Sequence, residues 1–293
     1  MRSSLMGGDK YLTVKSLDEV FKGLKGFEGR AKFVAGGTNV IPDMRAGAVS
    51  QELLVDISDL KDLGHISEEK GAVSIGALTT IAEVSSSRII QKQGPILSSA
   101  AGLLGNPLTR NRATVGGNLA DASPAADMAP PLLAMEALLL TERPAGKGRK
   151  IPIDQFFLSP NKTALEEDEI ITRITFPIPK DPSKGSHVKL GLRNAMAISV
   201  VSISVMLEME DKVCMKARVA LGSVAPKPIR AYHVEERLEG GEVGQDVIQE
   251  CSDIVRGEIS PISDIRASAE YRKRVSSVLL KRTIQEALKG EKK

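Results

Sequence analysis

The sequence predicts an α+β fold in two domains, and three observations support this prediction. The chain has 293 residues, more than the ~100–200 residues of a typical single domain. Short apolar strands alternate with helical segments along its first part, as in α/β and α+β proteins. Three prolines and one glycine then interrupt the pattern over residues 177–185. We therefore predict a first domain over residues 1–178 and a second, smaller domain over residues 186–290, joined by a proline-rich linker.

Local patterns predict the elements of the first domain. A helix is predicted over residues 16–24, because Ser16 and Glu19 have the spacing of a capping box. Residues 128–140 are apolar on most faces and predict a buried helix that runs into a strand. The other predicted elements are strands over residues 32–35, 52–57, 72–75 and 151–153, a helix that begins over residues 80–86, an exposed turn over residues 143–148 and a solvated acidic turn over residues 166–169.

The second domain is predicted to combine an antiparallel sheet with helices. Side chains alternate strictly over residues 198–209, and one face is more apolar than the other. Such a pattern is typical of an antiparallel sheet that is covered on one side. A hairpin partner is expected over residues 213–220. Helices are predicted over residues 234–238, 246–255 and 267–288, the last with Gly290 as its C-cap.

Composition excludes several classes of protein. Aromatic residues make up only 3% of the chain and tryptophan is absent, which argues against a protein that stacks on nucleic-acid bases. The net charge of +3 is spread among interspersed acids and bases, so no nucleic-acid partner is expected. The first ten residues lack the apolar core of a signal peptide, and no apolar run is long enough to span a bilayer. We expect a cytoplasmic protein without a membrane span.

The potential metal ligands are few and scattered. The two cysteines, Cys214 and Cys251, are far apart in sequence, which excludes a self-contained zinc site or iron–sulfur cluster. We expect both to be buried, reduced thiols. The histidines, His65, His187 and His233, have no metal-binding spacing, and we expect them to lie at the surface or to be satisfied by hydrogen bonds. No metal site is predicted.

Two glycine-rich motifs carry the pattern most suited to ligand binding. The first, AGGTN, comprises Ala35, Gly36, Gly37, Thr38 and Asn39, and the second, TVGGN, runs from position 114 to position 118. Glycine allows positive φ and a close approach of the backbone to a ligand, and consecutive N–H groups can bind an anion. Each motif alone is also compatible with a tight turn that binds nothing. Neither motif has the spacing of a Walker loop or of GxGxxG.

Together the two motifs resemble the flavin-binding signatures of the medium, FAD-binding subunit of molybdenum hydroxylases, the family of the xanthine dehydrogenase and carbon monoxide dehydrogenase flavoproteins. The resemblance continues through residues 151–174 and 221–231, in the order of the family. It implies a two-part FAD-binding domain of the vanillyl-alcohol-oxidase-like (PCMH) type, followed by the smaller domain of antiparallel sheet and helices. Residues 105–112, ahead of TVGGN, depart from the usual lead-in of the family.

The resemblance also implies which residues surround the cofactor. The first motif would cradle the pyrophosphate of FAD, and the TVGGN residues that would approach its pyrophosphate and ribityl part are Thr114, Gly116, Gly117 and Asn118. Asp121 stands where the family often has a small polar residue, and Asp127 would hold a sugar hydroxyl; alternatively, Asp127 is an N-cap ahead of Met128. Ile171 would lie against the isoalloxazine ring, and Lys189 would reach the cofactor from the second domain. Their simpler interpretations are a core strand residue and a solvated lysine.

By resemblance, the chain is an FAD-carrying oxidoreductase subunit with no catalytic side chain of its own. It would pass electrons from the [2Fe–2S] clusters of a small subunit, reduced by a large molybdenum-pterin subunit, to an external acceptor such as NAD. Two alternatives remain open at this point. One is a free-standing FAD enzyme of the same broad fold, and the other is a scaffold subunit that has lost its flavin.

Overall fold

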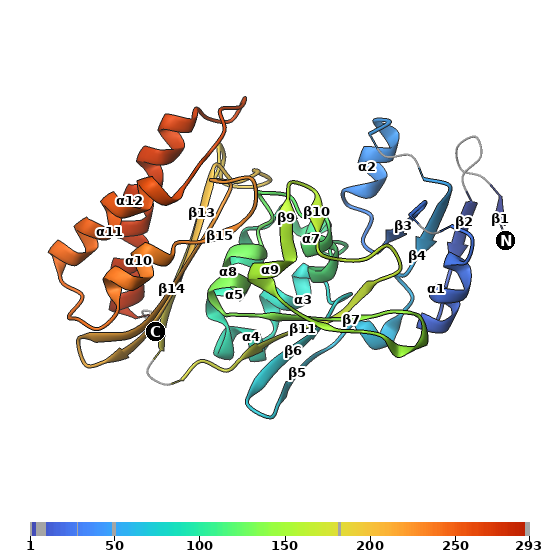
Figure 1. Cartoon of the computed structure of the whole chain (residues 1–293), viewed down its shortest axis with the longest axis horizontal. Helices are drawn as coiled ribbons and strands as arrows, with labels where there is room; N and C mark the ends of the chain where they lie inside the picture. Colours follow the sequence, from blue (N-terminus) through green and yellow to red (C-terminus); the bar gives the residue numbers. More distant parts are fainter. Residues whose placement is uncertain (1, 4–9, 28, 49–50, 181–182, 291–293) are drawn as a thin grey trace.

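In the computed structural model, the chain forms three layers along its longest axis (Figure 1). The structure describes residues 2–3, 10–27, 29–48, 51–180 and 183–290. A small, mostly parallel sheet lies at the N-terminal end, an antiparallel sheet with helices lies in the middle, and a second antiparallel sheet with helices lies at the C-terminal end. The predicted α+β class is therefore confirmed.

The N-terminal layer is a four-stranded sheet with the strand order β1-β2-β4-β3. Strands β2, β4 and β3 run parallel, and β1 pairs with β2 antiparallel. Because parallel strands end at the same edge, the segment after β3 and the end of β4 lie side by side, and the first glycine motif occupies this edge. The elements of the layer are β1 (Arg2–Ser3), β2 (Lys10–Thr13), α1 (Leu17–Leu24), β3 (Ala31–Val34), α2 (Val40–Arg45), β4 (Leu53–Asp56) and η1 (Lys61–Leu63).

The middle layer is a five-stranded antiparallel sheet, ordered β5-β6-β11-β7-β8, with short helices packed on it. Figure 1 shows most of these helices above the strands of this sheet. Its strands are β5 (Ile66–Glu69), β6 (Ala72–Gly76), β7 (Leu138–Glu142), β8 (Lys150–Pro152) and β11 (Ile170–Pro177). Its helices are α3 (Ile81–Ser86), α4 (Arg88–Gln93), α5 (Pro95–Leu103), α6 (Pro107–Arg110), α7 (Val115–Ala120), α8 (Ala129–Ala134) and α9 (Ile153–Phe156), and the turn η2 (Pro144–Gly146) and the hairpin β9 (Phe157–Ser159) with β10 (Lys162–Thr163) complete it.

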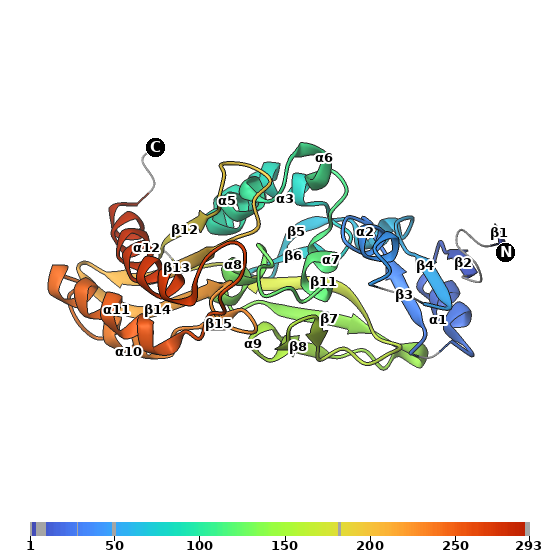
Figure 2. The ribbon, with the colours of Figure 1, turned by 90° about the horizontal axis from the view of Figure 1, so that it is seen from above.

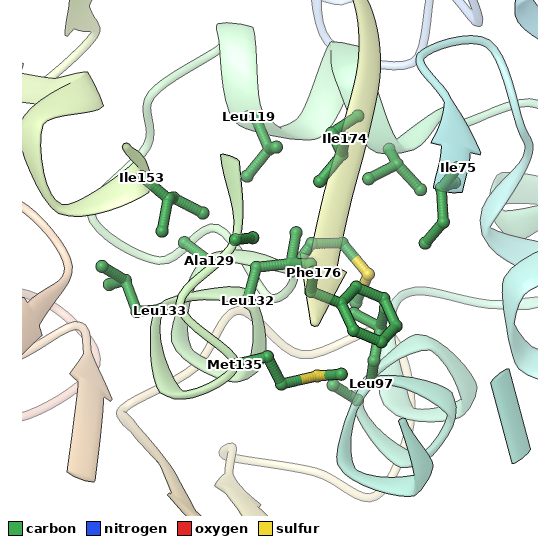
Figure 3. Close-up of a cluster of buried hydrophobic side chains, with 14 of the residues drawn as sticks. Ile75, Leu97, Leu119, Ala129, Leu132, Leu133, Met135, Ile153, Ile174 and Phe176 are labelled. Carbon is green, nitrogen blue, oxygen red and sulfur yellow. The ribbon is translucent and has the colours of Figure 1, made fainter. Parts of the chain in front are cut away.

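The apolar core of the middle layer lies between this sheet and its helices. Ile174 and Phe176 of β11 point into it and meet side chains from α8, such as Leu132, and Leu97 from α5 (Figure 3). Each of these side chains is almost fully removed from water. Because burial of one such side chain stabilises the fold by ~1.5–3 kcal/mol, the core anchors α7, which carries the second glycine motif, and α8, which follows it.

The C-terminal layer is a four-stranded antiparallel sheet, ordered β12-β13-β14-β15, with three helices on its outer face. The elements are β12 (Ser183–Leu190), β13 (Val201–Glu210), β14 (Val213–Gly222), β15 (Ile229–Arg230), α10 (Tyr232–Leu238), α11 (Gln245–Glu258) and α12 (Ala269–Lys289). Gly290 caps α12 with a φ of 72°, as predicted. Part of the predicted linker is already strand, since β12 begins at position 183, and residues 181–182 of the linker lie outside the described residues.

The expectation that this sheet is covered on one side is wrong. Ile203 and Val205 face the three helices, whereas Met206 and Ala220 belong to the core of the middle layer. Ser204, on the same face as Met206, is fully buried. The less apolar face therefore packs against the middle layer instead of meeting water, and alternation along one strand cannot show this.

A second correction concerns the acidic turn over residues 166–169, which is predicted to be solvated but contains a buried acid. Glu169 is only 2% exposed. Its carboxylate accepts hydrogen bonds from Arg149, at 2.8 Å, and from the Thr141 hydroxyl. These bonds outweigh its burial and lower the pKa of Glu169 to about 2. Through Glu169, the acidic turn therefore holds the start of β11 to β7.

Candidate functional site

The first glycine motif forms a turn between β3 and α2, and its consecutive backbone N–H groups are free to donate hydrogen bonds to a ligand. Among the described residues, we find no hydrogen-bond partner for the backbone N–H groups of Gly36, Gly37, Thr38 and Asn39. All four residues are at least partly exposed. Consecutive N–H groups without partners carry partial positive charge and suit an anion such as a phosphate.

The shape of this turn requires both of its glycines. Gly37 has a φ of 70°, a left-handed conformation that other residues rarely adopt. At Gly36, a Cβ atom would lie 1.9 Å from the carbonyl oxygen of Arg112. The turn is therefore pressed against the backbone that leads into the second motif. The segment in which the sequence departs from the family thus supports the first motif.

The second motif is a helix, not a loop. Thr114 is the N-cap of α7, and its hydroxyl accepts a hydrogen bond from the N–H of Gly117 at 3.1 Å. The N–H of Gly116 donates to the carbonyl oxygen of Ala77 at 2.8 Å, and that of Val115 donates to Thr79 at 3.0 Å. The start of α7 therefore offers a ligand no free amide from these three residues.

The two glycines of the second motif serve different purposes, and neither has a positive φ. A Cβ on Gly116 would lie 2.7 Å from Ala77, so this residue permits α7 to pack against the end of β6. Gly117 is exposed, and only the Thr114 hydroxyl lies near its missing Cβ, at 2.8 Å. Together with the exposed Ala120, Gly117 gives α7 a face without bulky side chains.

A side-chain hydrogen bond joins the two motifs. The amide of Asn39 donates to the carboxylate of Asp121 at 2.9 Å. Burial raises the pKa of Asp121, and the bond from Asn39 opposes this shift. This bond between residues 82 positions apart in sequence places the free N–H groups of the first motif beside the open face of α7.

Asp127 and Lys189 lie between the middle layer and the C-terminal layer and pair with each other. Their ion pair is 2.8 Å long, and the two side chains are only 12% and 6% exposed. The Ser199 hydroxyl donates to Asp127 at 3.0 Å, and the ammonium of Lys189 also donates to the carbonyl oxygen of Leu103 at 3.3 Å. Burial raises the pKa of Asp127, while Lys189 and Ser199 lower it. Asp127 does not cap α8, whose N-cap is Met128.

Two other predicted residues have structural surroundings. The side-chain carbonyl of Asn118 accepts a hydrogen bond from the N–H of Met128 at 3.1 Å, and so holds the loop that carries Asp127. Ile171 is 5% exposed and belongs to the core of the middle layer. Its strand, β11, packs beneath α7. Sequence reasoning missed Ser199 and Arg112, because each acts through a contact between distant segments.

The remaining candidates do not assemble into a second site. In the part of the chain that the structure describes, no group of three histidine, cysteine or acidic residues is placed to hold a metal ion. His187 is half-buried beside Ser204, and this burial lowers its pKa to about 3. Both cysteines are free and buried. A hollow of about 360 Å³, lined by residues such as Pro95 and Lys289, contains none of the predicted site residues.

Comparison with known protein families accounts for nearly the whole chain. Residues 6–179 match the model of the FAD binding domain in molybdopterin dehydrogenase. Residues 186–287 match the model of the carbon monoxide dehydrogenase flavoprotein C-terminal domain. No helix among the described residues is long and apolar enough to cross a membrane.

Individual relatives match over similar lengths. The xanthine dehydrogenase FAD-binding subunit of Escherichia coli O157:H7 is 33% identical, with 88% of this chain and 89% of the relative covered. The glyceraldehyde dehydrogenase medium chain of Sulfolobus acidocaldarius is 30% identical, with 94% and 97% covered. A solved structure of carbon monoxide dehydrogenase from Hydrogenophaga pseudoflava has a TM-score of 0.94 at 30% identity, and 98% of this chain and 99% of that chain are covered. This chain therefore belongs to the FAD-binding medium subunits of the molybdenum hydroxylases, the xanthine dehydrogenase and carbon monoxide dehydrogenase family.

Proposed function

We propose that the chain binds one FAD between its two glycine-rich motifs. The observation that carries this proposal is the series of free N–H groups at residues 36–39, held beside α7 by the bond between Asn39 and Asp121. The pyrophosphate of a dinucleotide needs such donors. The open face of α7 at Gly117 and Ala120 leaves space for a bulky ligand next to them. These features fit FAD.

Each predicted residue has a separate role in the proposed site. The first motif donates backbone hydrogen bonds to the pyrophosphate, and Gly117 leaves space for the cofactor because it has no side chain. Asp127 keeps unused acceptor capacity for a sugar hydroxyl, since a carboxylate has about four acceptor positions and the hydrogen bonds from Lys189 and Ser199 occupy two of them here. Lys189 holds Asp127 in place and fixes the second domain against the first. Ile171 would support the site from beneath α7.

We further propose that the chain transfers electrons and does not itself transform the organic substrate. When bound, FAD supplies a centre that accepts electrons and passes them on, a capacity that side chains lack. The residues of this chain bind FAD, orient it and exclude water from the domain seam. Cys214 and Cys251 are too few to ligate a [2Fe–2S] cluster, which needs four ligands. The electrons must then come from clusters on another polypeptide.

The partners that we propose are a large molybdenum-pterin subunit and a small subunit with [2Fe–2S] clusters. The relatives named medium chain or FAD-binding subunit support a multi-subunit enzyme. The names of the relatives include different substrates, and we propose that the large subunit, not this chain, selects the substrate. We propose NAD as the external acceptor. We also propose that residues 1–178 form the FAD-binding domain and residues 186–290 the C-terminal domain.

A comparison of the isolated chain with the assembled enzyme tests this function. The isolated chain, loaded with FAD, should transfer electrons from reduced nicotinamide to an artificial dye but should not hydroxylate an organic substrate. Hydroxylation should require the complex that contains molybdenum and iron. Turnover of an organic substrate by the pure chain, free of both metals, would favour a free-standing enzyme. A chain that takes up no flavin would favour a scaffold.

A further inference from the structure

An exposed apolar surface spans the two domains. It consists of Leu103 and Leu108, around α6, and of Leu192, Met196 and Ile198, in the loop between β12 and β13. Leu108 is 77% exposed, and the other four side chains are also well exposed. Clusters of large apolar side chains on a soluble protein often mark sites of association.

Direct contacts make these two segments one surface. The N–H of Met196 donates to the carbonyl oxygen of Gly105 at 3.3 Å, and the amide of Asn106 lies 3.3 Å from the Met196 sulfur. The guanidinium of Arg193 donates to the carbonyl oxygen of Met196 at 2.6 Å and stiffens the loop. Figure 2 shows the loop beside α6. We call the five apolar residues the Leu108–Met196 surface.

The two chain segments that form this surface carry basic residues and no acidic ones. No aspartate or glutamate occurs from position 84 to position 120 or from position 183 to position 207. Arg112 and Arg193 are exposed in these stretches. An apolar centre with methionine and arginine and without carboxylates is typical of the core of a protein interface. Its complement is a face with apolar side chains at the centre and carboxylates at the rim.

The surface also adjoins the proposed FAD site. The carbonyl oxygen of Leu103 accepts a hydrogen bond from Lys189, which pairs with Asp127. Arg112 supports the first glycine motif through its backbone. A partner on the Leu108–Met196 surface would therefore contact the segments that carry the cofactor, where an electron donor must dock.

We propose that the Leu108–Met196 surface docks the iron–sulfur subunit of the enzyme, through an apolar face of that subunit with an acidic rim. The inference rests on the proposed function, and it goes beyond it in naming the surface. Docking across both domains would also hold them in one arrangement.

The test compares two double variants of the chain, each purified from its native host through an affinity tag as part of the whole complex. Leu192→Asp/Met196→Asp places two charges in the surface. Leu158→Asp/Met215→Asp is the matched control, since Met215 is 54% exposed and Met196 is 53% exposed. FAD, iron and molybdenum are measured per chain, and the mass of each species is measured by light scattering.

We expect the surface variant to keep its FAD and to lose iron by about tenfold or more, since buried unpaired charges at an interface centre abolish most of the affinity. The control should keep FAD and iron. Undiminished iron in the surface variant, or equal loss in the control, would overturn the proposed surface alone. A surface variant that keeps iron but changes from dimer to monomer would show that a second copy of this chain occupies the surface. Wild-type chain that carries FAD but never iron would overturn the proposed function instead.

Discussion

Removal of the charge of Lys189 should destabilise the protein far more than removal of an ion pair of equal length at the surface. The pair between Lys189 and Asp127 is 2.8 Å long and nearly buried. The pair between Lys216 and Glu136 is also 2.8 Å long, but its side chains are 44% and 39% exposed. The same chemical change, Lys189→Met or Lys216→Met, therefore removes a buried pair in one variant and an exposed pair in the other. Glu136 also keeps Arg218 at 3.7 Å and Arg230 at 3.8 Å when Lys216 is removed.

The magnitude follows from burial. At 2.8 Å, two unit charges attract by about 6 kcal/mol if the effective dielectric constant is about 20. Desolvation of both groups offsets most of this attraction in the native protein. Removal of one partner leaves the other charge buried, which costs about 3–5 kcal/mol. An exposed pair contributes about 0–1 kcal/mol. We expect Lys189→Met to lower the free energy of unfolding by about 3–5 kcal/mol, and Lys216→Met to lower it by less than about 1 kcal/mol.

The effect should also depend on pH in a defined direction. Burial raises the pKa of Asp127, and Lys189 opposes that shift, so Lys189→Met raises the pKa of Asp127 further. Below this pKa the carboxyl group is neutral, and no unpaired charge is buried. The destabilisation should therefore be largest at neutral pH and should shrink as the pH falls through the pKa of Asp127.

Urea unfolding followed by circular dichroism measures these differences, and flavin fluorescence reports release of FAD in the same samples. In a double-mutant cycle, Lys189→Met and Asp127→Asn should couple by about 1–3 kcal/mol. The argument that the buried pair stabilises the contact between the middle and C-terminal layers would be refuted by either of two results. One is an equal loss of unfolding free energy in Lys189→Met and Lys216→Met, and the other is a loss that grows as the pH falls.

Three further predictions concern the glycine motif, the buried acid and the thiols. Gly117→Val should abolish FAD binding with little loss of helical signal, because its side chain would enter the open face of α7, whereas Gly102→Val, in open space on α5, should bind FAD normally; equal flavin absorbance in both would place the cofactor elsewhere. Glu169→Gln should remove about 1–3 kcal/mol of stability that the wild type has above pH 4.5 and loses as the pH falls toward about 2, and a pH-independent difference between the two unfolding curves would contradict the pairing with Arg149. Both cysteines, whose pKa values burial raises to about 11, should react with a thiol reagent only after unfolding, and rapid labelling of the native chain would show that they are accessible.

Local sequence predicted those features of the fold that depend on neighbours along the chain. The Ser16 hydroxyl accepts a hydrogen bond from the N–H of Glu19 as expected, but the Glu19 carboxylate accepts from the N–H of Lys15 and does not complete the capping box. The apolar run over residues 128–140 becomes α8 and β7. Gly290 ends the last helix in a left-handed conformation. Each of these depends on propensities and hydrogen bonds within a few residues.

Features that depend on distant segments were not predictable from local pattern. Two glycines disfavour a helix, yet TVGGN is helical, because Thr114 caps it and the backbones of Ala77 and Thr79 receive its first N–H groups. The pairing of Asp127 with Lys189 joins the middle layer to the C-terminal layer. Family resemblance selected both residues as candidates, but only the structure brings them together.

The flavin content of the purified chain tests the central claim most directly. No cysteine or histidine lies in either glycine motif, so FAD should be held without a covalent bond. The native chain should show flavin absorbance equivalent to one FAD, and acid denaturation should release all of it into the supernatant as FAD. A purified chain that shows no flavin absorbance after incubation with FAD, or a flavin that stays with the denatured polypeptide, would contradict the account.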